Sequence, residues 1–560
     1  MNSEVGSNNP KLQSVNYITI LPEGKTSGYT PGQQVDFKID PIQFPYIDGK
    51  QSYLLLNVTP TGTFSNVTAT ADVPLMFPPN QGANSLVNRL VCRVNDGTGK
   101  IIEDREAYNL YNGIRNSYTN DTDVFPALAK VEGVTGRSTA LVNRSISNVN
   151  NTYFYPQPDI STTPGTALSG NKLQQNSFVV PIQLGLFSGF GDQHMAVPNM
   201  DIGGCHLTYH LETANRTLQT LTHEFLRLES INNSDVVACN PKGLIDVLTG
   251  DWVSTTEFEI STDECDCSLV LNEKPFTIDM CAFRVGMPIK SVDKGLGVSI
   301  VTAVQIDGDN IKVTVADAIG VVGSDSISAD EISSRSYTID KIELRVLNTM
   351  PDMPTMKSMK KAVQRGINFN STQLYKLSTA SQLKNAVLDI PESLTKCLSI
   401  YAVPCQQNDL NSTDLSNSYV FPRPDSALPG NTNNYNYQWQ VKQVLIPNLQ
   451  VDTNVETDTK NDNVIFFNQQ IMAQRPMYPV RSLDDGALSC MSDNSDLNLP
   501  FFFPLLLAPM GQSFDLIDAA PQLRVENTES TDTTSKLYFV FINHVRMLQG
   551  NSMGGIDVTF

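Results

Sequence analysis

Short runs in which apolar and polar residues alternate with a period of two dominate this 560-residue chain. The clearest lie at residues 34–40, 205–212, 341–346 and 435–442. Such alternation is typical of β-strands with one face in a core and the other toward water or a partner. The run 537–545 (LYFVFINHV) is apolar on both faces, so we expect a central strand or one whose outer face meets another domain. These patterns predict an all-β protein built from sandwiches.

Helical patterns are few. The strongest covers residues 103–115 (EDREAYNLYNGIR), where the apolar side chains fall on one helical face and Asp104 can cap the start. Weaker helical patterns cover residues 215–228 and 356–365. The preceding segment, 90–102, contains an Asn-Asp-Gly turn and predicts a strand, a tight turn and a second strand ahead of the helix.

The strand patterns divide into two regions. We assign a first sandwich to residues 1–350, a linker to residues 351–365 and a second sandwich to residues 366–560. The boundary is placed there because the stretch 350–359 (MPDMPTMKSM) carries two prolines between alternating runs, as a joint between domains does.

Residues 230–336 differ in composition from the rest of the first sandwich. They hold 17 acidic and 7 basic residues, so a net charge of −10 lies within this one segment of a chain whose total is −19. Apolar alternation on both sides of a turn at residues 307–310 predicts a hairpin inside the segment. We interpret 230–336 as a small acidic β domain inserted into a loop of the first sandwich.

The acidity of the whole chain narrows the range of partners. A sequence pI near 4.7 disfavours broad contact with nucleic acid, which requires a basic face, and no specific nucleic-acid site is predicted. The first residues show neither the basic nor the apolar part of a leader, and the strongest apolar run, 499–510, is about half the length that spans a bilayer. Nine scattered cysteines form no small disulfide framework, so we expect a reducing compartment.

Two glycine-containing segments resemble phosphate-binding loops only superficially. The stretch 96–100 (DGTGK) lacks the first glycine and the final Ser or Thr of a Walker A motif, and a hairpin turn explains it better. Gly185, Gly189 and Gly191 do not lie between a strand and a helix as a dinucleotide fingerprint requires. We interpret these three glycines as sources of loop flexibility.

Cysteine and histidine provide two further candidate sites. Four cysteines in the acidic segment could bind zinc or form a disulfide, although the Cys-x-Cys spacing of two of them is unusual for zinc and ordinary thiols are the simpler interpretation. They are Cys239, Cys265, Cys267 and Cys281. Two histidines on one strand, at positions 206 and 210, lack a neighbouring carboxylate motif, so a metal site there is disfavoured.

No combination of residues in the chain matches a catalytic motif. There is no Gly-x-Ser-x-Gly elbow and no His-Glu-x-x-His, and acid pairs such as Asp484-Asp485 lie in polar turns. We therefore predict no catalytic residue, cofactor or metal, and we expect a structural or binding role rather than an enzyme.

The order of four segments resembles a double jelly-roll major capsid protein of the kind found in virophages, polinton-like viruses and related large DNA viruses. Residues 84–112 resemble the strand, turn, strand and helix of the first roll, and residues 177–212 and 337–348 resemble its later and closing strands. The Pro- and Met-rich joint follows, and residues 537–560 resemble the closing strands of the second roll. The resemblance covers nearly the whole chain apart from residues 230–336.

This resemblance implies a non-enzymatic structural subunit of a virion. It implies that the chain forms a homotrimer with six lobes, a pseudo-hexameric capsomer that tiles the facets of an icosahedral capsid. Its partners would be further copies of itself, neighbouring trimers, and penton and minor capsid proteins. The protein would be made in the host cytoplasm or a viral factory and reside in the capsid.

The acidic segment departs from the simplest family pattern because it falls between the last two strands of the first roll. In an eight-stranded jelly roll, successive connections alternate between the two ends, so this connection shares an end with three others. In the family that end faces outward. We therefore expect residues 230–336 to form a tower on the outer surface, where it could contact the host surface and its charge would keep particles apart.

Two other functions remain open from the residues alone. A host- or glycan-binding β-sandwich adhesin would be a monomer or fibre with a ligand pocket. A carbohydrate-active β enzyme would need a carboxylate pair in a cleft. The mass and shape of the purified protein would separate both from a trimeric capsomer.

Overall fold

The computed structural model describes most sandwich strands and part of their connections. The described residues are 12–64, 75–78, 81–94, 99–119, 128, 131–134, 177–188, 196–220, 225–230, 237–242, 248–261, 288–294, 297–308, 310–329, 332–378, 385–390, 394–406, 435–452, 462–477, 502–508, 513–517, 519–527, 536–550 and 556–559.

The first sandwich consists of two sheets. Sheet 1A has the strand order β1-β19-β3-β7, with the short β8 also paired to β3, and sheet 1B has the order β2-β9-β5-β6. The bounds of these strands are β1 Leu12–Ile20, β2 Gln34–Ile39, β3 Tyr46–Phe64, β5 Val87–Val94, β6 Ile101–Glu106, β7 Ser177–Pro181, β8 Ala196–Val197, β9 Cys205–Leu211 and β19 Ile332–Pro351.

The second sandwich repeats this arrangement. Sheet 2A has the order β20-β27-β22-β25, with β28 also paired to β27, and sheet 2B has the order β21-β26-β23-β24. The bounds are β20 Ile367–Ser378, β21 Asn385–Asp389, β22 Cys397–Gln406, β23 Tyr435–Val441, β24 Val444–Asp452, β25 Phe503–Leu506, β26 Gln522–Asn527, β27 Lys536–Gly550 and β28 Ile556–Thr559.

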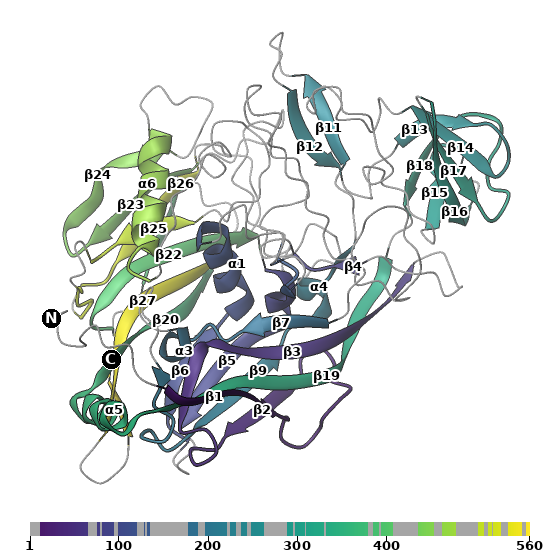
Figure 1. The fold of residues 1–560 in the computed structure, drawn as a ribbon. Coiled ribbons are helices and arrows are strands. Elements are labelled where there is room, and N and C mark those ends of the chain that lie inside the picture. The colour runs from purple at the N-terminus through teal and green to yellow at the C-terminus, as the bar shows by residue number, and fades with distance from the viewer. Residues whose placement is uncertain are drawn as a thin grey trace.

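Both sandwiches have the same connectivity. If the eight principal strands of each are counted along the chain, sheets 1A and 2A read first, eighth, third, sixth, and sheets 1B and 2B read second, seventh, fourth, fifth. This double Greek-key order is that of a jelly roll. The prediction of an all-β fold with two tandem jelly rolls is confirmed, and Figure 1 shows the two rolls side by side.

The run that is apolar on both faces forms β27, the eighth strand of the second roll. As expected, β27 is central, because it pairs with β20 on one side and with β22 on the other. Val540, Phe541 and Ile542 are all fully buried, although consecutive strand residues point to opposite faces. Something must therefore cover the outer face of sheet 2A as well as the inner one.

Each roll has its own apolar core between its two sheets. In the first, Phe37 and Tyr209 pack edge to face, with ring centroids 5.9 Å apart. In the second, Trp439 and Tyr437 are fully buried, and Tyr437 packs against Phe503 at 5.2 Å. Large aromatic side chains of this kind bury more apolar area than any other residue type and give each roll a core of its own.

The helix predicted at residues 103–115 begins later than expected. Residues Ile101–Glu106 form strand β6, and helix α1 covers Tyr108–Thr119, so Asp104 does not cap it. The turn between them is made at Ala107, whose φ is +46°. Pairing with β5, in which Glu103 lies opposite Cys92, outweighs the helical pattern. The helix predicted at 215–228 is also wrong, because α4 covers only Ala214–Thr217.

A closed six-stranded barrel lies between the seventh and eighth strands of the first roll. Its ring has the order β13-β14-β17-β16-β15-β18. The bounds are β13 Leu248–Trp252, β14 Glu257–Ser261, β15 Pro288–Ser291, β16 Val298–Asp307, β17 Asn310–Val315 and β18 Gly323–Ala329. The predicted hairpin is confirmed as β16 and β17, and β19 begins at Ile332.

Two-stranded pairs and short helices complete the described structure. The pairs are β4 Leu75–Met76 with β10 Gln219–Thr220, and β11 Phe225–Ser230 with β12 Val237–Lys242. The short helices are η1 Gly82–Leu86 and α3 Gly185–Ser188. Helix α6 covers Asp462–Gln474 in the second roll.

Helix α5, Met353–Arg365, joins the two rolls and contains the predicted helix at 356–365. Asp352 caps it by accepting a hydrogen bond from the Thr355 N–H at 3.0 Å. Because α5 follows the eighth strand and the barrel precedes it, they lie at opposite ends of the first roll. Figure 1 shows this separation clearly.

Candidate assembly surfaces

The two rolls meet where α1 packs on the outer face of sheet 2A. The Tyr111 ring lies 5.6 Å from that of Phe541, and its hydroxyl donates to the Asn543 side chain at 3.4 Å. Asn543 also accepts from Thr372 at 2.8 Å and donates to Ser399 at 3.0 Å. All five residues are buried. A buried polar network therefore ties α1 to the strands β20, β27 and β22 of sheet 2A.

A buried carboxylate lies between two arginines beside this contact. Glu103 on β6 is fully buried, pairs with Arg105 at 2.8 Å and accepts the Gly185 N–H at 2.7 Å. Arg546 of the second roll donates to the Ile102 carbonyl at 2.8 Å. Burial raises the pKa of Glu103 and lowers that of Arg546, while their mutual attraction opposes both shifts. Because buried charges need partners, this group fixes how the two rolls are placed.

Gly185 allows the backbones of the two rolls to approach closely. A Cβ on this glycine would lie 1.6 Å from the Asn370 carbonyl oxygen on β20. No other residue type fits there without moving one roll away from the other. The interpretation of Gly185 as a source of loop flexibility is therefore wrong, since close packing requires it. Gly189 and Gly191 lie outside the described residues.

Ion pairs at the rim connect the rolls further. Lys376 on β20 lies 3.6 Å from Glu106 on β6, and Lys100 lies 2.8 Å from Asp557 on β28. Lys100 belongs to the DGTGK stretch, of which residues 96–98 lie outside the described part. The Val94 N–H donates to the Lys100 carbonyl at 2.9 Å, which closes the expected hairpin between β5 and β6. Exposed pairs of this kind contribute little stability.

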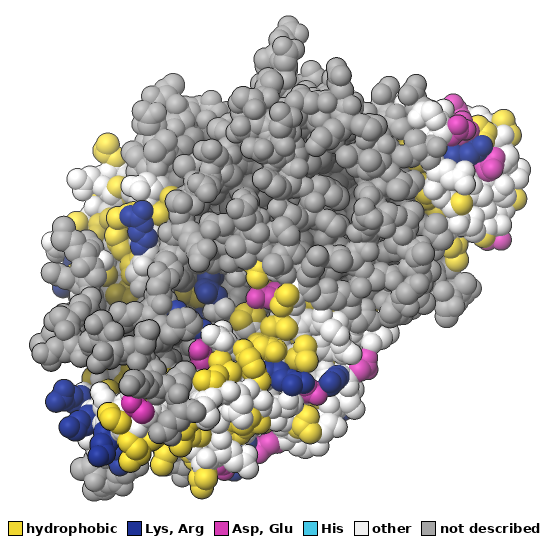
Figure 2. All heavy atoms as spheres, in the orientation of Figure 1, with side chains coloured by type: hydrophobic (Ala, Val, Ile, Leu, Met, Phe, Trp, Pro, Cys, Tyr) yellow, Lys and Arg dark blue, Asp and Glu magenta, His cyan; other side chains and the backbone are white. Residues whose placement is uncertain are grey.

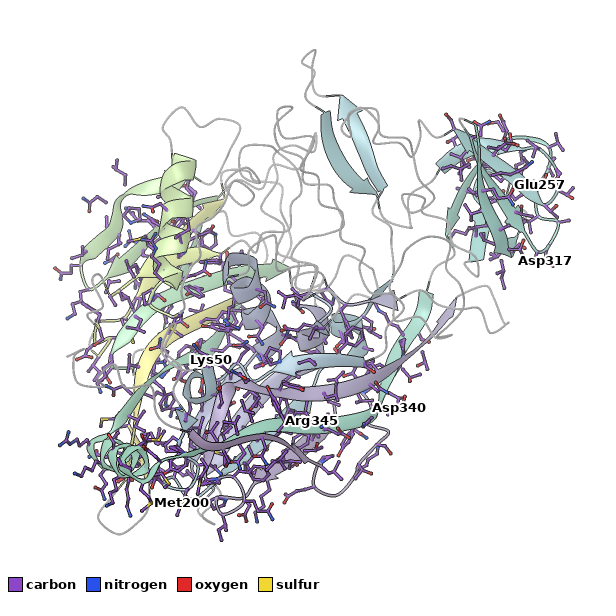
Figure 3. All side chains as sticks on the ribbon, viewed as in Figure 1. Lys50, Met200, Glu257, Asp317, Asp340 and Arg345 are labelled. Carbon is purple, nitrogen blue, oxygen red and sulfur yellow. The ribbon has the colours of Figure 1, made fainter. Side chains whose placement is uncertain are left out.

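The outer face of sheet 1A, unlike that of sheet 2A, is open. Val15 and Tyr17 on β1 are 49% and 51% exposed, and the Tyr17 ring lies 6.1 Å from that of Tyr53 on β3. Figure 2 shows hydrophobic side chains gathered with charged ones over this sheet, and Figure 3 places Arg345 on it. Arg345 and Lys341 flank Glu343 at 2.7 and 3.0 Å. The outer face of sheet 1A therefore presents both apolar and charged side chains to solvent.

The barrel is held by a buried carboxylate of its own. Asp325 accepts hydrogen bonds from the Trp252 indole at 2.8 Å and from Ser291 at 2.7 Å. Desolvation raises the pKa of Asp325, but these hydrogen bonds outweigh it and the net shift is downward. On the barrel surface, Lys312 lies 3.7 Å from both Glu257 and Glu259. The barrel thus has a satisfied interior and charged walls, as Figure 3 shows around Glu257.

The structure gives no support to a metal site at His206 and His210, which the sequence already disfavours. His206 lies 3.6 Å from Glu23 and 3.8 Å from Asp36, and burial lowers the pKa of His210. No group of three or more His, Cys, Asp or Glu side chains able to hold a metal occurs among the described residues. Cys265, Cys267 and Cys281 lie outside them, as does the side chain of Cys239.

Within the described part of the chain, no helix is both long and apolar enough to cross a membrane.

Sequence reasoning missed the residues that join the rolls. Glu103 was expected in a helix, and nothing distinguished Arg546 or Asn543 from other polar residues. One signal was available, since the two-sided apolar run that became β27 indicated that its outer face meets another domain. The partner of that face, α1, could not be read from the sequence.

Comparison with solved structures supports the fold independently. The Faustovirus major capsid protein matches with a TM-score of 0.50 and 10% identity over 98% of this chain and 92% of that one. A chain of the Sputnik virophage matches with a TM-score of 0.45 and 12% identity over 100% and 92% of the two chains. The mavirus major capsid protein matches with a TM-score of 0.39 and 9% identity over 99% and 93%. Neither a protein-family model nor a curated protein sequence matches this chain.

Proposed function

We propose that this chain is a major capsid protein whose homotrimers form pseudo-hexameric capsomers of an icosahedral viral shell. The observation that carries the proposal is the pair of jelly rolls with identical strand order, locked together in one chain by a buried junction. Three such two-lobed chains around a threefold axis give six similar lobes, a tile that fills a flat facet.

The likeness of the fold to the Faustovirus major capsid protein supports this proposal. Under it, the chain resides in the virion, and its partners are other copies, neighbouring trimers, and penton and minor capsid proteins. The adhesin alternative gains nothing from the comparisons.

The barrel would then form the outer tower. It is inserted at the end of the first roll opposite α5, and its segment carries over half of the net negative charge of the chain. A tower at this position would be free to contact the host surface, and its charge would keep particles apart.

The mass and shape of the purified full-length chain test the proposal. We expect a particle of three times 61.6 kDa by light scattering and a near-hexagonal outline in negative stain. A protein that stays at 61.6 kDa at every concentration tested would overturn the proposal.

A further inference from the structure

Helix α5, which joins the two rolls, is strongly basic although the chain as a whole is acidic. Residues 353–365 contain four basic and no acidic side chains, in a chain whose net charge is −19. The four are Lys357, Lys360, Lys361 and Arg365, and all of them are exposed. None of the four forms an ion pair with another described residue. Figure 2 shows Lys and Arg side chains gathered over α5 at the lower left, where an external anion can reach them.

Two loops of the first roll lie at the same end as α5. Successive connections of a jelly roll alternate between its two ends, so the β2–β3 loop, the segment from β7 to β9 and the segment after β19 share one end. Tyr46 at the start of β3 pairs with Thr349, just before α5, which places the first loop beside the helix. The Met200 N–H donates to the Pro45 carbonyl at 2.8 Å and ties the second loop to the first. Figure 3 places Met200 at the α5 end of the first roll.

Each of these three segments exposes a large apolar side chain. Ile42 is 88% exposed, Met200 is 59% exposed and Met353 at the start of α5 is 57% exposed. The backbone that carries Ile42 is fixed, because the Asp40 carboxylate accepts the Ile42 N–H at 2.7 Å. We call these three apolar side chains and the four cations of α5 the α5 surface. Apolar groups exposed together in this way mark an interaction site.

Three acidic side chains beside the α5 surface are engaged within the chain itself. Asp40 holds the loop around Ile42, and Asp352 caps α5. Asp201 accepts a hydrogen bond from the Tyr46 hydroxyl at 3.2 Å. Burial raises the pKa of Asp201, and the nearby charge of Lys360 opposes that rise. The groups that the α5 surface offers to a partner are therefore cationic and aliphatic.

We propose that the α5 surface binds an anionic lipid bilayer. Lys and Arg side chains attract anionic headgroups, and aliphatic side chains beside them enter the boundary between headgroups and acyl chains. Nucleic acid fits this surface less well, because Ile and Met do not stack on bases as aromatic side chains do. A protein partner would need a surface shaped to match three separate segments, whereas a bilayer accepts protruding side chains without such a match.

This inference goes beyond the proposed function and does not need the trimer. The α5 surface and the acidic barrel lie at opposite ends of the first roll, so the chain is basic at one end and acidic at the other. If the barrel faces outward as proposed, the bilayer lies on the inner side of the shell.

Sedimentation of the full-length protein with lipid vesicles tests the cations. We expect binding to vesicles of equal parts phosphatidylcholine and phosphatidylserine, little binding to pure phosphatidylcholine, and weaker binding at high salt. Lys357→Gln/Lys361→Gln should raise the dissociation constant about 30-fold, roughly fivefold per lysine. The matched control is Lys341→Gln/Lys376→Gln, which removes the same charge from side chains that are 55% and 50% exposed outside the α5 surface. We expect less than about a twofold change for the control.

A second pair of variants tests the apolar contribution. Ile42→Asn should raise the dissociation constant for the same anionic vesicles about tenfold, because the side chain no longer gains from leaving water. Val322→Asn is the matched control, since Val322 is 68% exposed in the barrel at the opposite end of the first roll. The control should bind like the unmodified chain.

The outcomes separate this inference from the proposed function. Equal binding to both vesicle compositions, or equal losses in the α5 variants and their controls, would overturn the inference. Binding to duplex DNA but to neither vesicle would identify nucleic acid as the partner instead. Light scattering on the same samples gives the mass: a monomer that binds anionic vesicles overturns the proposed function alone, and a trimer that binds none overturns this inference alone. Circular dichroism checks folding, and Lys360→Gln/Arg365→Gln replaces the first double variant should it not fold.

Discussion

Sheets 1A and 2A have the same strand order and opposite surroundings. The outer face of sheet 2A carries Phe541, Asn543 and Thr372, all buried beneath α1. The same face of sheet 1A carries Val15 and Tyr17, both about half exposed. Connectivity alone therefore does not decide whether a jelly-roll face is covered. What decides it is which neighbour reaches the face, and for one of the two rolls that neighbour belongs to the same chain.

The largest expected effect comes from adding a side chain where the backbones of the two rolls lie close together. In Gly185→Ala, the new Cβ would lie 1.6 Å from the Asn370 carbonyl oxygen, so sheet 2A and the first roll must separate. We expect a loss of more than about 4 kcal/mol in the free energy of unfolding, measured by urea denaturation.

A matched glycine tests whether this loss is specific. The Cβ of Gly550→Ala would lie 3.7 Å from Val363 Cγ1 and 3.9 Å from the Val363 carbonyl oxygen, and both are ordinary contacts. We expect a change below about 1 kcal/mol there. Equal losses at Gly185 and Gly550 would mean that the close approach does not hold the rolls together.

The next effect contrasts two carboxylates, each placed between cations. Glu103→Ala removes the buried carboxylate that pairs with Arg105 and attracts Arg546, so we expect a loss of about 3–5 kcal/mol in the free energy of unfolding. Glu343 on sheet 1A is itself largely buried, but its partners Lys341 and Arg345 are 55% and 33% exposed, so water can solvate both cations in Glu343→Ala. We expect a loss of about 1 kcal/mol or less there.

Chemical denaturation of both variants in parallel measures the difference. If Glu343→Ala costs as much as Glu103→Ala, sheet 1A is no more open than sheet 2A in the isolated protein. The measurement is best made below the concentration at which the chain associates, because association adds to apparent stability.

Acid should lower the free energy of unfolding through His544, which lies on β27 of sheet 2A. Burial, with Arg546 and Arg105 nearby, lowers its pKa to about 4. The unfolded chain has the ordinary value near 6.5, so below that pH the unfolded state binds a proton that the folded state does not. Stability present above pH 6.5 is therefore lost as the pH falls toward 4, and we expect a loss of about 2 kcal/mol from this group between pH 7 and pH 5.

Urea midpoints measured across that pH range for the unmodified chain and for His544→Asn provide the check. Asn does not titrate, so this part of the pH dependence should disappear in the variant. If the slope is the same in both proteins, His544 is not the group that titrates.

The sequence predicts the parts of this fold that depend on local pattern. Alternation located strands such as β2, β9 and β23, and the two-sided run at 537–545 identified a central strand with a second neighbour. The pattern failed at 103–106, where four residues with helical spacing pair with β5 instead, because the sheet satisfies their backbone groups and buries Glu103 against the second roll.

The junction could not be predicted, because its contacts join residues hundreds of positions apart. Tyr111 and Asn543 are separated by 432 residues, and neither has an unusual neighbourhood in the sequence. The role of Gly185 depends on a carbonyl oxygen of β20, so a list of glycines cannot distinguish a close approach from a flexible loop. Contacts of this kind become visible only when the two rolls are placed.

We expect the smallest effect from removing the barrel, because the barrel covers neither sheet 1A nor sheet 2A. The barrel closes its own ring of strands and holds its own buried Asp325, Trp252 and Ser291. Replacing residues 248–329 by a short Gly-Ser linker should therefore change the melting temperature of the two rolls by less than about 2 °C, measured by scanning calorimetry on the full remaining chain. A fall in melting temperature of more than about 5 °C would mean that the barrel stabilises the first roll. The first roll would then depend on the barrel as well as on the second roll.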